Sequence, residues 1–387
     1  MKWVSLIPLI GGLSIAMEDV FGCPPQSVIS APEFKENDQH LLEYYSNRFL
    51  DIPYLGMEWI PSNIDVVGAI PPCAGLSSLS KDYGEFNSHN DWLIKSADYA
   101  MGEIKPKVFW GENSPHLAGN VGAGIRAKLS VIARKNGYSS LYYRTSSHNH
   151  GLSQVRERTF FFFFKDSKVP MFRNYNIAPS SISDLLMQDN DFDMVINKNI
   201  PSEHPSYKFV LDELHGGISH AKFSREINYQ RAVRDVDIYS YIELQCKNLN
   251  DVVLWMKSNN FLDEAKKWEY RINKLQSGGS LMYRGPIVPV DQIGAFVSHY
   301  PKMLTHPLED RYITVREALT IMGMPKDFFL VKPNKNYNHI CQNVPVQTAT
   351  HMAEEILAFL DGKRPILPTD YAIQHNTKEK TLGEFFE

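Results

Sequence analysis

The sequence predicts an α/β fold with a doubly wound, mostly parallel sheet and a second, smaller domain. Short β-rich runs alternate with helix-like stretches from the start to about residue 165, which is the pattern of a parallel sheet with helices on both faces. Gly11-Gly12 separates the first apolar run from the first helix-like stretch, as a strand-to-helix turn would. After residue 165 the alternation gives way to irregular Asn-, Asp- and Ser-containing sequence, which indicates a separate unit.

The expected elements follow one another in regular order. Strands are predicted at WVSLIPLI, SVISA, IDVVGAI, KVFWG, SLYYRT and RTFFFFF. Helices are predicted at GLSIAMEDVF, NDQHLLEYYSNRF, NDWLIKSADYAMGEI and AGIRAKLSVIARKNG. The run Phe160–Phe164 would promote aggregation on a surface, so we expect a strand that is covered on both faces.

The 387-residue chain is long enough for two or three structural units. We expect a first domain, built on the sheet, over residues 1–165 and a second domain over residues 166–283. Residues 284–387 resume orderly strand or helix patterns after a Ser-Gly-Gly-Ser hinge, and we expect their final helix to pack on the first domain.

Composition and cysteine spacing exclude several classes of protein. No run of about 18 apolar residues is present, which argues against a membrane span. Four cysteines are widely scattered without CxxC spacing, so neither a disulfide framework nor a metal site is indicated. The opening MKWVSLIPLIGGLSIA imitates a secretory signal, but the glycine pair and the acidic stretch after it favour a strand, turn and helix. A net charge of −4 leaves nucleic-acid binding open, because a basic cleft can lie in an acidic protein.

One cysteine stands where an active-site nucleophile would. The segment IDVVGAIPPCAGLSS is an apolar strand that ends in Pro71-Pro72-Cys73. Ligands collect outside the carboxyl ends of strands in α/β sheets, so Cys73 is a candidate nucleophile. A single cysteine at a strand end can equally be a small buried hydrophobe, and its neighbours decide between the two.

Two further segments supply those neighbours. KVFWGENS places Glu112 and Asn113 directly after an apolar run. GLSQVRERTFFFFF places Gln154, Arg156 and Arg158 at alternating positions, so the three side chains share one face of a strand. Two arginines on one face indicate either an anion or hydrogen-bonded base, or a structural ion pair.

The order and spacing of PPC, GEN and QVRER resemble the motifs of the DNA cytosine carbon-5 methyltransferase family. HPLEDRYITVREALTIMGMPKDF, with Arg311, Thr314, Arg316 and Glu317, is similar to the family's late motif, and QNVPVQTATHMAEEI resembles its final motif. The resemblance therefore extends over essentially the whole chain. It implies a Rossmann-like methyltransferase sheet that binds S-adenosylmethionine, and it makes residues 166–283 the target-recognition domain.

The resemblance also implies a mechanism on double-stranded DNA. Cytosine carbon 5 is a weak nucleophile, so the Cys73 thiolate would add to carbon 6 of a flipped-out cytosine. Arg156 and Arg158 would favour the thiolate, and Arg158 would hold the exocyclic oxygen. Glu112 would donate to ring nitrogen 3. The Gly- and Ser-containing loop at residues 74–90 would close over the base.

The donor turn departs from the family's pattern. Gly11 and Gly12 match the Gly-rich turn after the first strand, but Ile7 and Leu9 stand where the family has an aromatic residue and a glycine. The usual stacking contact with adenosine is therefore altered.

The other donor contacts are assigned through the resemblance. Glu36 best matches the acid that bonds the ribose hydroxyls, with Glu33 as the alternative. Asp51 fits the acid after the third strand that faces the adenine amino group. Pro72 and Asn343 border the same pocket.

Three alternatives remain open from the sequence. An RNA cytosine methyltransferase needs the same pocket, although the long variable unit favours DNA. A binding protein that has lost donor use would fit the altered turn, although it would not need Cys73, Glu112 and Arg158. A cytosine-modifying enzyme with another donor also fits. We further expect a monomer in the cytoplasm of a bacterial or phage-infected cell, in the setting of restriction and modification.

Overall fold

The computed structural model describes most of the chain, and it divides into two compact units. The described residues are 1–49, 51–77, 84–186, 203–223, 238–278, 293–296 and 313–376. The first unit comprises residues 1–180, 322–331 and 342–387, and the second comprises 181–321 and 332–341. The expected boundaries at residues 165 and 283 stay predictions, because this division follows packing and assigns no roles.

The first unit is built on an eight-stranded, mostly parallel sheet. Its strands are β1 (Trp3–Leu6), β2 (Val28–Ser30), β3 (Tyr54–Gly56), β4 (Val66–Ala69), β5 (Val108–Asn113), β6 (Ser139–Ser146), β8 (Glu157–Phe164) and β10 (Tyr371–His375). Their order is β10-β6-β8-β5-β4-β1-β2-β3. Strand β8 is antiparallel to both of its neighbours, and every other pair is parallel. The predicted α/β fold with a Rossmann-like methyltransferase sheet is confirmed.

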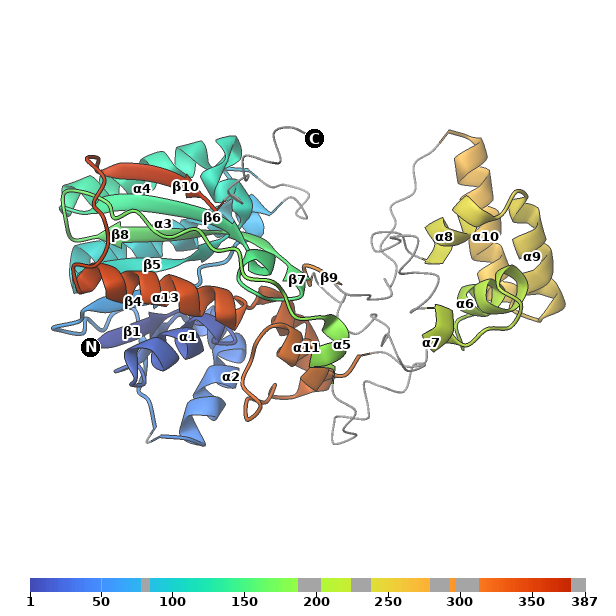
Figure 1. Ribbon diagram of the computed structural model, residues 1–387, viewed down its shortest axis with the longest axis horizontal. Helices are drawn as coiled ribbons and strands as arrows, with labels where there is room; N and C mark the ends of the chain where they lie inside the picture. Colours follow the sequence, from blue (N-terminus) through green and yellow to red (C-terminus); the bar gives the residue numbers. More distant parts are fainter. Residues whose placement is uncertain are drawn as a thin grey trace. The chain divides into compact units, whose positions relative to one another are not determined.

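Helices flank this sheet (Figure 1). They are α1 (Gly12–Phe21), α2 (Lys35–Ser46), α3 (Asp91–Asp98), α4 (Ala123–Lys135) and α13 (Val346–Leu360). Helices α1 and α13 lie side by side, although more than 300 residues separate them in the chain, and α3 packs against α4. The last helix thus packs on the first.

The five consecutive phenylalanines form the centre of the sheet. Each ring from Phe160 to Phe164 is fully buried, which is the two-sided cover that the sequence predicts. Trp110 of β5 stacks on Phe162 with ring centroids 5.7 Å apart and an interplanar angle of 8°. This aromatic core fixes β8 against β5, so the residues just before Phe160 are held on a rigid strand.

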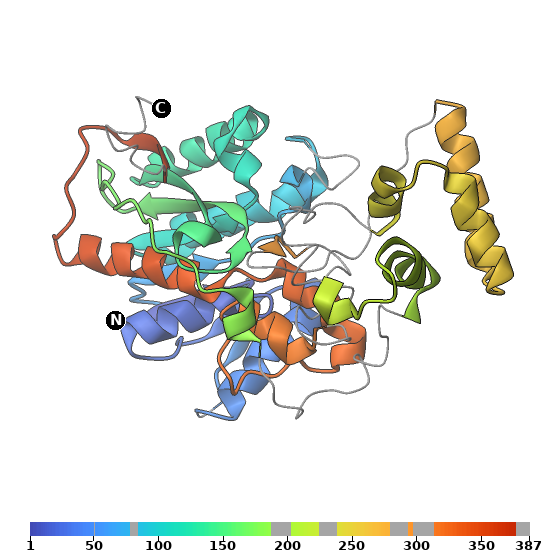
Figure 2. The same ribbon diagram turned by 45° about the vertical axis from the view of Figure 1, so that its right-hand side comes forward.

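The second unit has a helical core of its own (Figure 2). Its helices are α5 (Ile182–Leu185), α6 (Pro205–Phe209), α7 (His220–Lys222), α8 (Ile238–Gln245), α9 (Leu249–Ser258), α10 (Leu262–Gln276), α11 (Val315–Ile321) and α12 (Pro333–Asn336). Trp268 of α10 is fully buried in a cluster with Met256 of α9 and Ile242 of α8. The first unit also contains the short strand β7 (Gln154–Val155), and the second contains the short strand β9 (Ile293–Gly294).

The described helices were also compared with what a membrane span requires. None of them is both long enough and apolar enough to cross a bilayer.

Candidate active site

Cys73 and Glu112 lie at the carboxyl ends of neighbouring parallel strands. Strand β4 ends at Ala69 and leads through two prolines into Cys73, and Glu112 is the last residue but one of β5. Glu112 thus belongs to the strand itself, rather than following it as the sequence predicts. A Cβ on Gly111 would come within 2.0 Å of the Ala69 carbonyl oxygen. Glycine at this position therefore allows the two strand ends to lie close together.

Strand β8 brings the arginines to the same place. Phe160 lies opposite Glu112, and Arg158 precedes Phe160 by two residues, so Arg158 is a diagonal neighbour of Glu112. Arg158 Nε lies 2.5 Å from Glu112 Oε1. Two residues further back Arg156 is also buried, with 2% of its surface exposed. The two arginines share one face, as the alternation predicts.

The thiol of Cys73 responds electrostatically to all three of these charged residues. Burial raises the pKa of Cys73, and Glu112 raises it further, whereas Arg158 and Arg156 lower it. Such effects require proximity, so the structure brings the four predicted catalytic residues together. The raised pKa means that the thiol is protonated near neutral pH, and the arginines are the groups that stabilise a thiolate when one forms.

Glu112 is a buried carboxyl group with a raised pKa. It is 2% exposed, and burial raises its pKa above the ordinary value, while Arg158 and Arg156 oppose the shift. A buried carboxyl beside two guanidinium groups can both accept their hydrogen bonds and donate a proton to a base in the site.

The loop after Cys73 is anchored where it is described. Gly84 N donates to Gly75 O at 2.8 Å, and Asn90 Nδ2 donates to Gly84 O at 2.8 Å. The ends of the predicted closing loop are thus held beside Cys73. Residues 78–83 of that loop lie outside the described residues.

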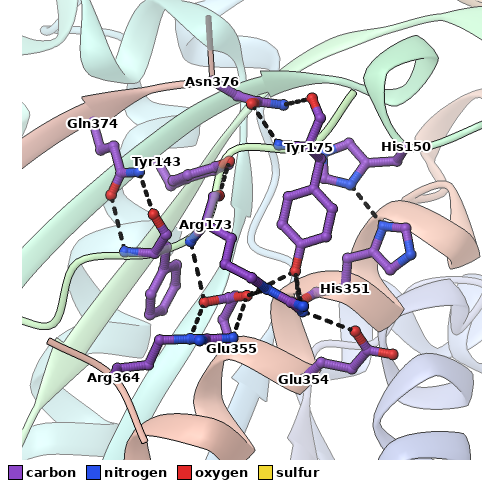
Figure 3. A network of polar contacts seen from close by, with 11 residues as sticks. Tyr143, His150, Arg173, Tyr175, His351, Glu354, Glu355, Arg364, Gln374 and Asn376 are labelled. Atoms are coloured by element: carbon purple, nitrogen blue, oxygen red, sulfur yellow. Dashed lines mark hydrogen bonds and ion pairs between the residues drawn. The ribbon is translucent and has the colours of Figure 1, made fainter. Parts of the chain in front are cut away.

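Two neutral histidines, His150 and His351, connect β6, the strand that pairs with β8, to helix α13. Thr145 of β6 lies opposite Arg158, and its Oγ1 is 2.8 Å from His150 Nε2. His150 Nδ1 is in turn 2.9 Å from Nδ1 of His351 on α13 (Figure 3). Burial, and secondarily His351, lowers the pKa of His150 to about 3, so the ring is uncharged at neutral pH.

A buried carboxylate completes this support (Figure 3). Glu355 of α13 is fully buried, 2.7 Å from Arg173 Nε and 2.5 Å from Arg364 Nε. Tyr175 donates to Glu355 at 2.8 Å and stacks on the ring of His351 with centroids 4.6 Å apart. The network joins β6, α13 and the segment after β8, so it fixes the hairpin that carries the arginines.

The turn after β1 has left-handed backbone, which usually requires glycine, at two positions that are not glycine. Ile7 has φ +48°, Leu9 has φ +54° and Gly11 has φ +101°. Left-handed backbone costs an L-residue about 1–2 kcal/mol, so Ile7 and Leu9 are strained. Both side chains are buried, with 0% and 6% of their surfaces exposed. Packing therefore holds the turn in the shape that a Gly-rich sequence would adopt.

Asn343 closes this turn from the far end of the chain. Gly12 N donates to Asn343 Oδ1 at 2.9 Å, which caps the first residue of α1. A Cβ on Gly12 would lie 2.3 Å from Val344 O, so no larger residue fits without a shift. The predicted donor residues Gly11, Gly12 and Asn343 are thus brought together.

The predicted acids are placed differently from one another. Glu36 lies in the first turn of α2, whereas its alternative Glu33 lies in the short turn directly after β2. Asp51 precedes β3, which puts it toward the amino end of that strand. Pro72 is half-buried next to Cys73 at the carboxyl end of β4. Asp51 alone is therefore not brought to the edge of the sheet where the others lie.

Glu58 is the acid that follows β3. A Cβ on Gly56, the last residue of β3, would come within 2.1 Å of Glu58 Oε2, so this carboxylate lies over the strand's end. Sequence reasoning missed Glu58, because a three-residue strand leaves no apolar run to mark where it ends. Its only signal is the turn-like sequence Gly-Met-Glu-Trp.

Asp38 of α2 is a second residue that the sequence does not mark. It is fully buried, and Tyr54 donates to its Oδ2 at 3.1 Å. Burial raises its pKa to about 7, although the Ser30 hydroxyl, Tyr54 and the Leu9 amide all favour the charged form. This carboxyl therefore lies behind the strained turn and titrates near neutrality.

The late motif forms a helix cap in the second unit. Thr314 Oγ1 accepts from Glu317 N at 3.0 Å, and Glu317 Oε2 accepts from Thr314 N at 2.7 Å. This reciprocal pair is a capping box at the start of α11. Arg311 of the same motif lies outside the described residues.

Comparisons with solved structures agree with this architecture. A prophage-encoded chain from E. coli, described as a DNA modification methyltransferase, is 18% identical, covers 93% of this chain and 99% of its own, and superposes with a TM-score of 0.57. The Entamoeba histolytica methyltransferase EhMeth is 13% identical over 93% of this chain and 98% of its own, with a TM-score of 0.57. The S. pombe Dnmt2 methyltransferase is 12% identical over 93% and 99%, with a TM-score of 0.52. At these identities the likeness shows the fold.

Sequence comparison decides the family. No curated protein sequence matches the chain significantly. The model of the C-5 cytosine-specific DNA methylase family matches residues 1–358, which include Cys73, Glu112 and both arginines. With the strand-end cluster and the methyltransferase fold, this match shows that the chain belongs to the C-5 cytosine-specific DNA methylase family.

Proposed function

We propose that the chain is an S-adenosylmethionine-dependent DNA cytosine-5 methyltransferase that acts through a covalent Cys73 adduct. The observation that carries the proposal is the Arg158–Glu112 ion pair beside the Cys73 thiol. A binding protein has no need of a thiol, a protonatable carboxyl and two arginines in one buried cluster. Addition to a pyrimidine uses every one of them.

Each residue of the cluster has a role in the proposed reaction. Cys73 adds to carbon 6 of a flipped-out cytosine, which makes carbon 5 nucleophilic. Arg156 and Arg158 stabilise the thiolate, and Arg158 also holds the exocyclic oxygen of the base. Glu112, whose pKa is raised by burial, donates to ring nitrogen 3 as negative charge develops there.

The residues around the first turn fit a nucleoside-bearing donor. The backbone of Ile7, Leu9 and Gly11 gives the turn after β1 a left-handed path, and Gly12 lies in close contact with Asn343 and Val344. S-adenosylmethionine supplies the methyl group there. Asn343 and Pro72 border this donor site. Glu33 or Glu36 holds the ribose, and Glu58 faces the adenine in place of Asp51, because Glu58 follows β3.

The second unit is assigned to target recognition. The expected segment, residues 166–283, includes the helical cluster from α6 to α10, which has its own apolar core. A separately folded unit can contact DNA while the sheet supplies the chemistry. We assign the protein a double-stranded DNA substrate, action as a monomer, and a place in restriction and modification in a bacterial or phage-infected cytoplasm.

Methyl transfer from a labelled donor tests the proposal. Purified protein with labelled S-adenosylmethionine and duplex DNA should place the label on cytosine carbon 5, and sequencing of 5-methylcytosine should reveal the target site. Label that appears only in tRNA would assign the chain to RNA. A titration that detects no donor binding would favour a binding protein or another donor.

A further inference from the structure

The side chain of Gln154 is fully buried, and neither atom of its amide finds a partner among the residues that the structure describes. It is 0% exposed, and no residue in the described part of the chain forms a hydrogen bond with its Oε1 or Nε2. A buried, unsatisfied amide costs about 1–3 kcal/mol, so natural proteins rarely keep one without a use.

Gln154 points to the same side as the catalytic arginines. Along the segment, Gln154 and Arg156 are buried, whereas Val155 and Glu157 between and after them are exposed. Arg158 continues the series with a side chain that is 16% exposed and paired with Glu112. The three alternate side chains therefore face the cluster around Cys73.

Hydrogen bonds to Ser147 hold the backbone of Gln154 in place. The Ser147 hydroxyl donates to Gln154 O and accepts from Arg156 N at 3.0 Å, and Ser147 N donates to Arg156 O at 3.1 Å. One serine thus fixes the chain on both sides of Val155. These bonds fix the main chain, so the amide starts from a defined position on the buried face of the segment.

We propose that Gln154 donates a hydrogen bond to the phosphodiester next to the flipped cytosine. This proposal rests on the proposed function. Arg158 and Glu112 occupy the polar edge of the base, and Gln154 of β7 lies four residues before Arg158 of β8, roughly 13 Å back along an extended chain. At that distance it is beyond the base and meets the sugar–phosphate backbone. Glutamine amides are common donors to phosphate oxygens, and a phosphate satisfies the amide that the protein leaves unpaired.

The substitution Gln154→Met separates this role from a structural one. Methionine has a similar length and shape but no hydrogen-bonding amide, so the variant should melt no lower than the wild-type protein. Its KM for target duplex should rise about tenfold, as expected for loss of a hydrogen bond to a charged group, with kcat changed less. Gln154→Leu provides a second shape should the methionine variant not fold.

Tyr142→Phe is the matched control. The Tyr142 hydroxyl is also buried, and it has no partner among the described residues, but it lies in the middle of β6 away from the cluster. Its removal should leave both the melting temperature and KM at least as favourable as in the wild-type protein.

A modified duplex identifies the contact. A methylphosphonate beside the target cytosine removes the charge of that phosphate and one of its acceptor oxygens. It should weaken binding by wild-type protein about tenfold, and should weaken binding by Gln154→Met much less, because the partner is already gone.

Three results would overturn the proposal. Two of them reject only the role of Gln154, and the third also rejects the proposed function. Unchanged KM in Gln154→Met, or equal methylphosphonate effects in both proteins, would mean that Gln154 does not contact the phosphate. Wild-type protein that methylates no duplex would reject the proposed function, and the role of Gln154 with it.

Discussion

At the scale of single residues, the cluster at the ends of β4, β5 and β8 makes a direct prediction for Cys73. Duplex containing 5-fluorocytosine should trap the protein covalently, because fluorine replaces the proton that must leave carbon 5. Cys73→Ser should abolish trapping and lower turnover by at least about a thousandfold, since a hydroxyl is scarcely ionised at neutral pH. The readout is a shifted band on a denaturing gel with donor present.

Two further measurements on this cluster check the assignment. The raised pKa of Cys73 predicts that trapping by wild-type protein becomes faster as the pH rises above neutrality. Glu112→Gln should slow trapping while DNA binding stays close to that of wild type, because an amide cannot supply the proton. A shifted band with Cys73→Ser would place the nucleophile elsewhere.

Asp38 makes a prediction about stability. Its folded-state pKa of about 7 lies above the unfolded value near 3.8, so the folded protein binds the extra proton between these values. The contribution of Asp38 to the free energy of unfolding is therefore complete below about pH 4, and it is lost as the pH rises toward 7. Asp38→Asn should stabilise the protein at pH 8 by on the order of 2 kcal/mol and leave it unchanged at pH 4. Equal urea midpoints for both proteins at pH 8 would contradict this.

Residues that follow a clear apolar run can be located from the sequence. Residues whose position depends on strand pairing or on burial in the folded protein cannot. Cys73 and Glu112 follow long apolar runs, so their strand-end positions can be predicted. Asp51 and Glu58 flank a three-residue strand, and only its pairing with β2 shows which of them lies at the carboxyl end. Nothing in the sequence around Asp38 indicates that this carboxyl is buried.

At the scale of elements, the histidine pair predicts how the β6–β8 hairpin responds to acid. The pKa of His150 is lowered to about 3, so the unfolded chain binds more protons than the folded one between about pH 6.5 and 3. The contribution of His150 to the free energy of unfolding is then complete above about pH 6.5, and it falls as the pH decreases. For His150 alone, the free energy of unfolding should fall by about 2 kcal/mol between pH 6.5 and 5.

The variant His150→Gln measures this contribution. Denaturant unfolding at pH 7 and pH 5 should give a smaller loss of stability for the variant than for wild type. His375→Gln is a suitable control, since His375 is an exposed residue at the end of β10. An unchanged difference between the two pH values in His150→Gln would show that the pair is not neutral in the folded state.

Elements with a strong pattern are predictable, and short or late ones are not. The runs that became β1, β2, β4, β5, β6 and β8 carry enough apolar residues to be recognised. Strand β3 has only three residues, and β10 forms because residues 371–375 pair with β6 across the chain. The reversed direction of β8 likewise follows from its partners and not from its sequence.

At the scale of the whole molecule, the separate core of the second unit predicts that recognition and chemistry can be exchanged independently. Replacing residues 181–283, the part of the expected segment 166–283 that lies in the second unit, with the corresponding segment of a relative should transfer that relative's site preference, while Cys73 still forms the adduct. Sequencing of 5-methylcytosine in DNA from cells that express the chimera is the measurement. An active chimera that keeps the original preference would refute the assignment of this segment.

The bond between Gly12 and Asn343 spans 331 positions of the chain, and this span has a consequence for protein synthesis. A ribosome releases Cys73, Glu112 and both arginines well before it has made the residue that caps α1. Contacts of such long range form late in folding. A nascent or prematurely terminated chain that ends before residue 343 therefore carries Cys73, Glu112 and both arginines without the capped turn at Gly12, so the proposed donor site is completed only when translation is nearly over.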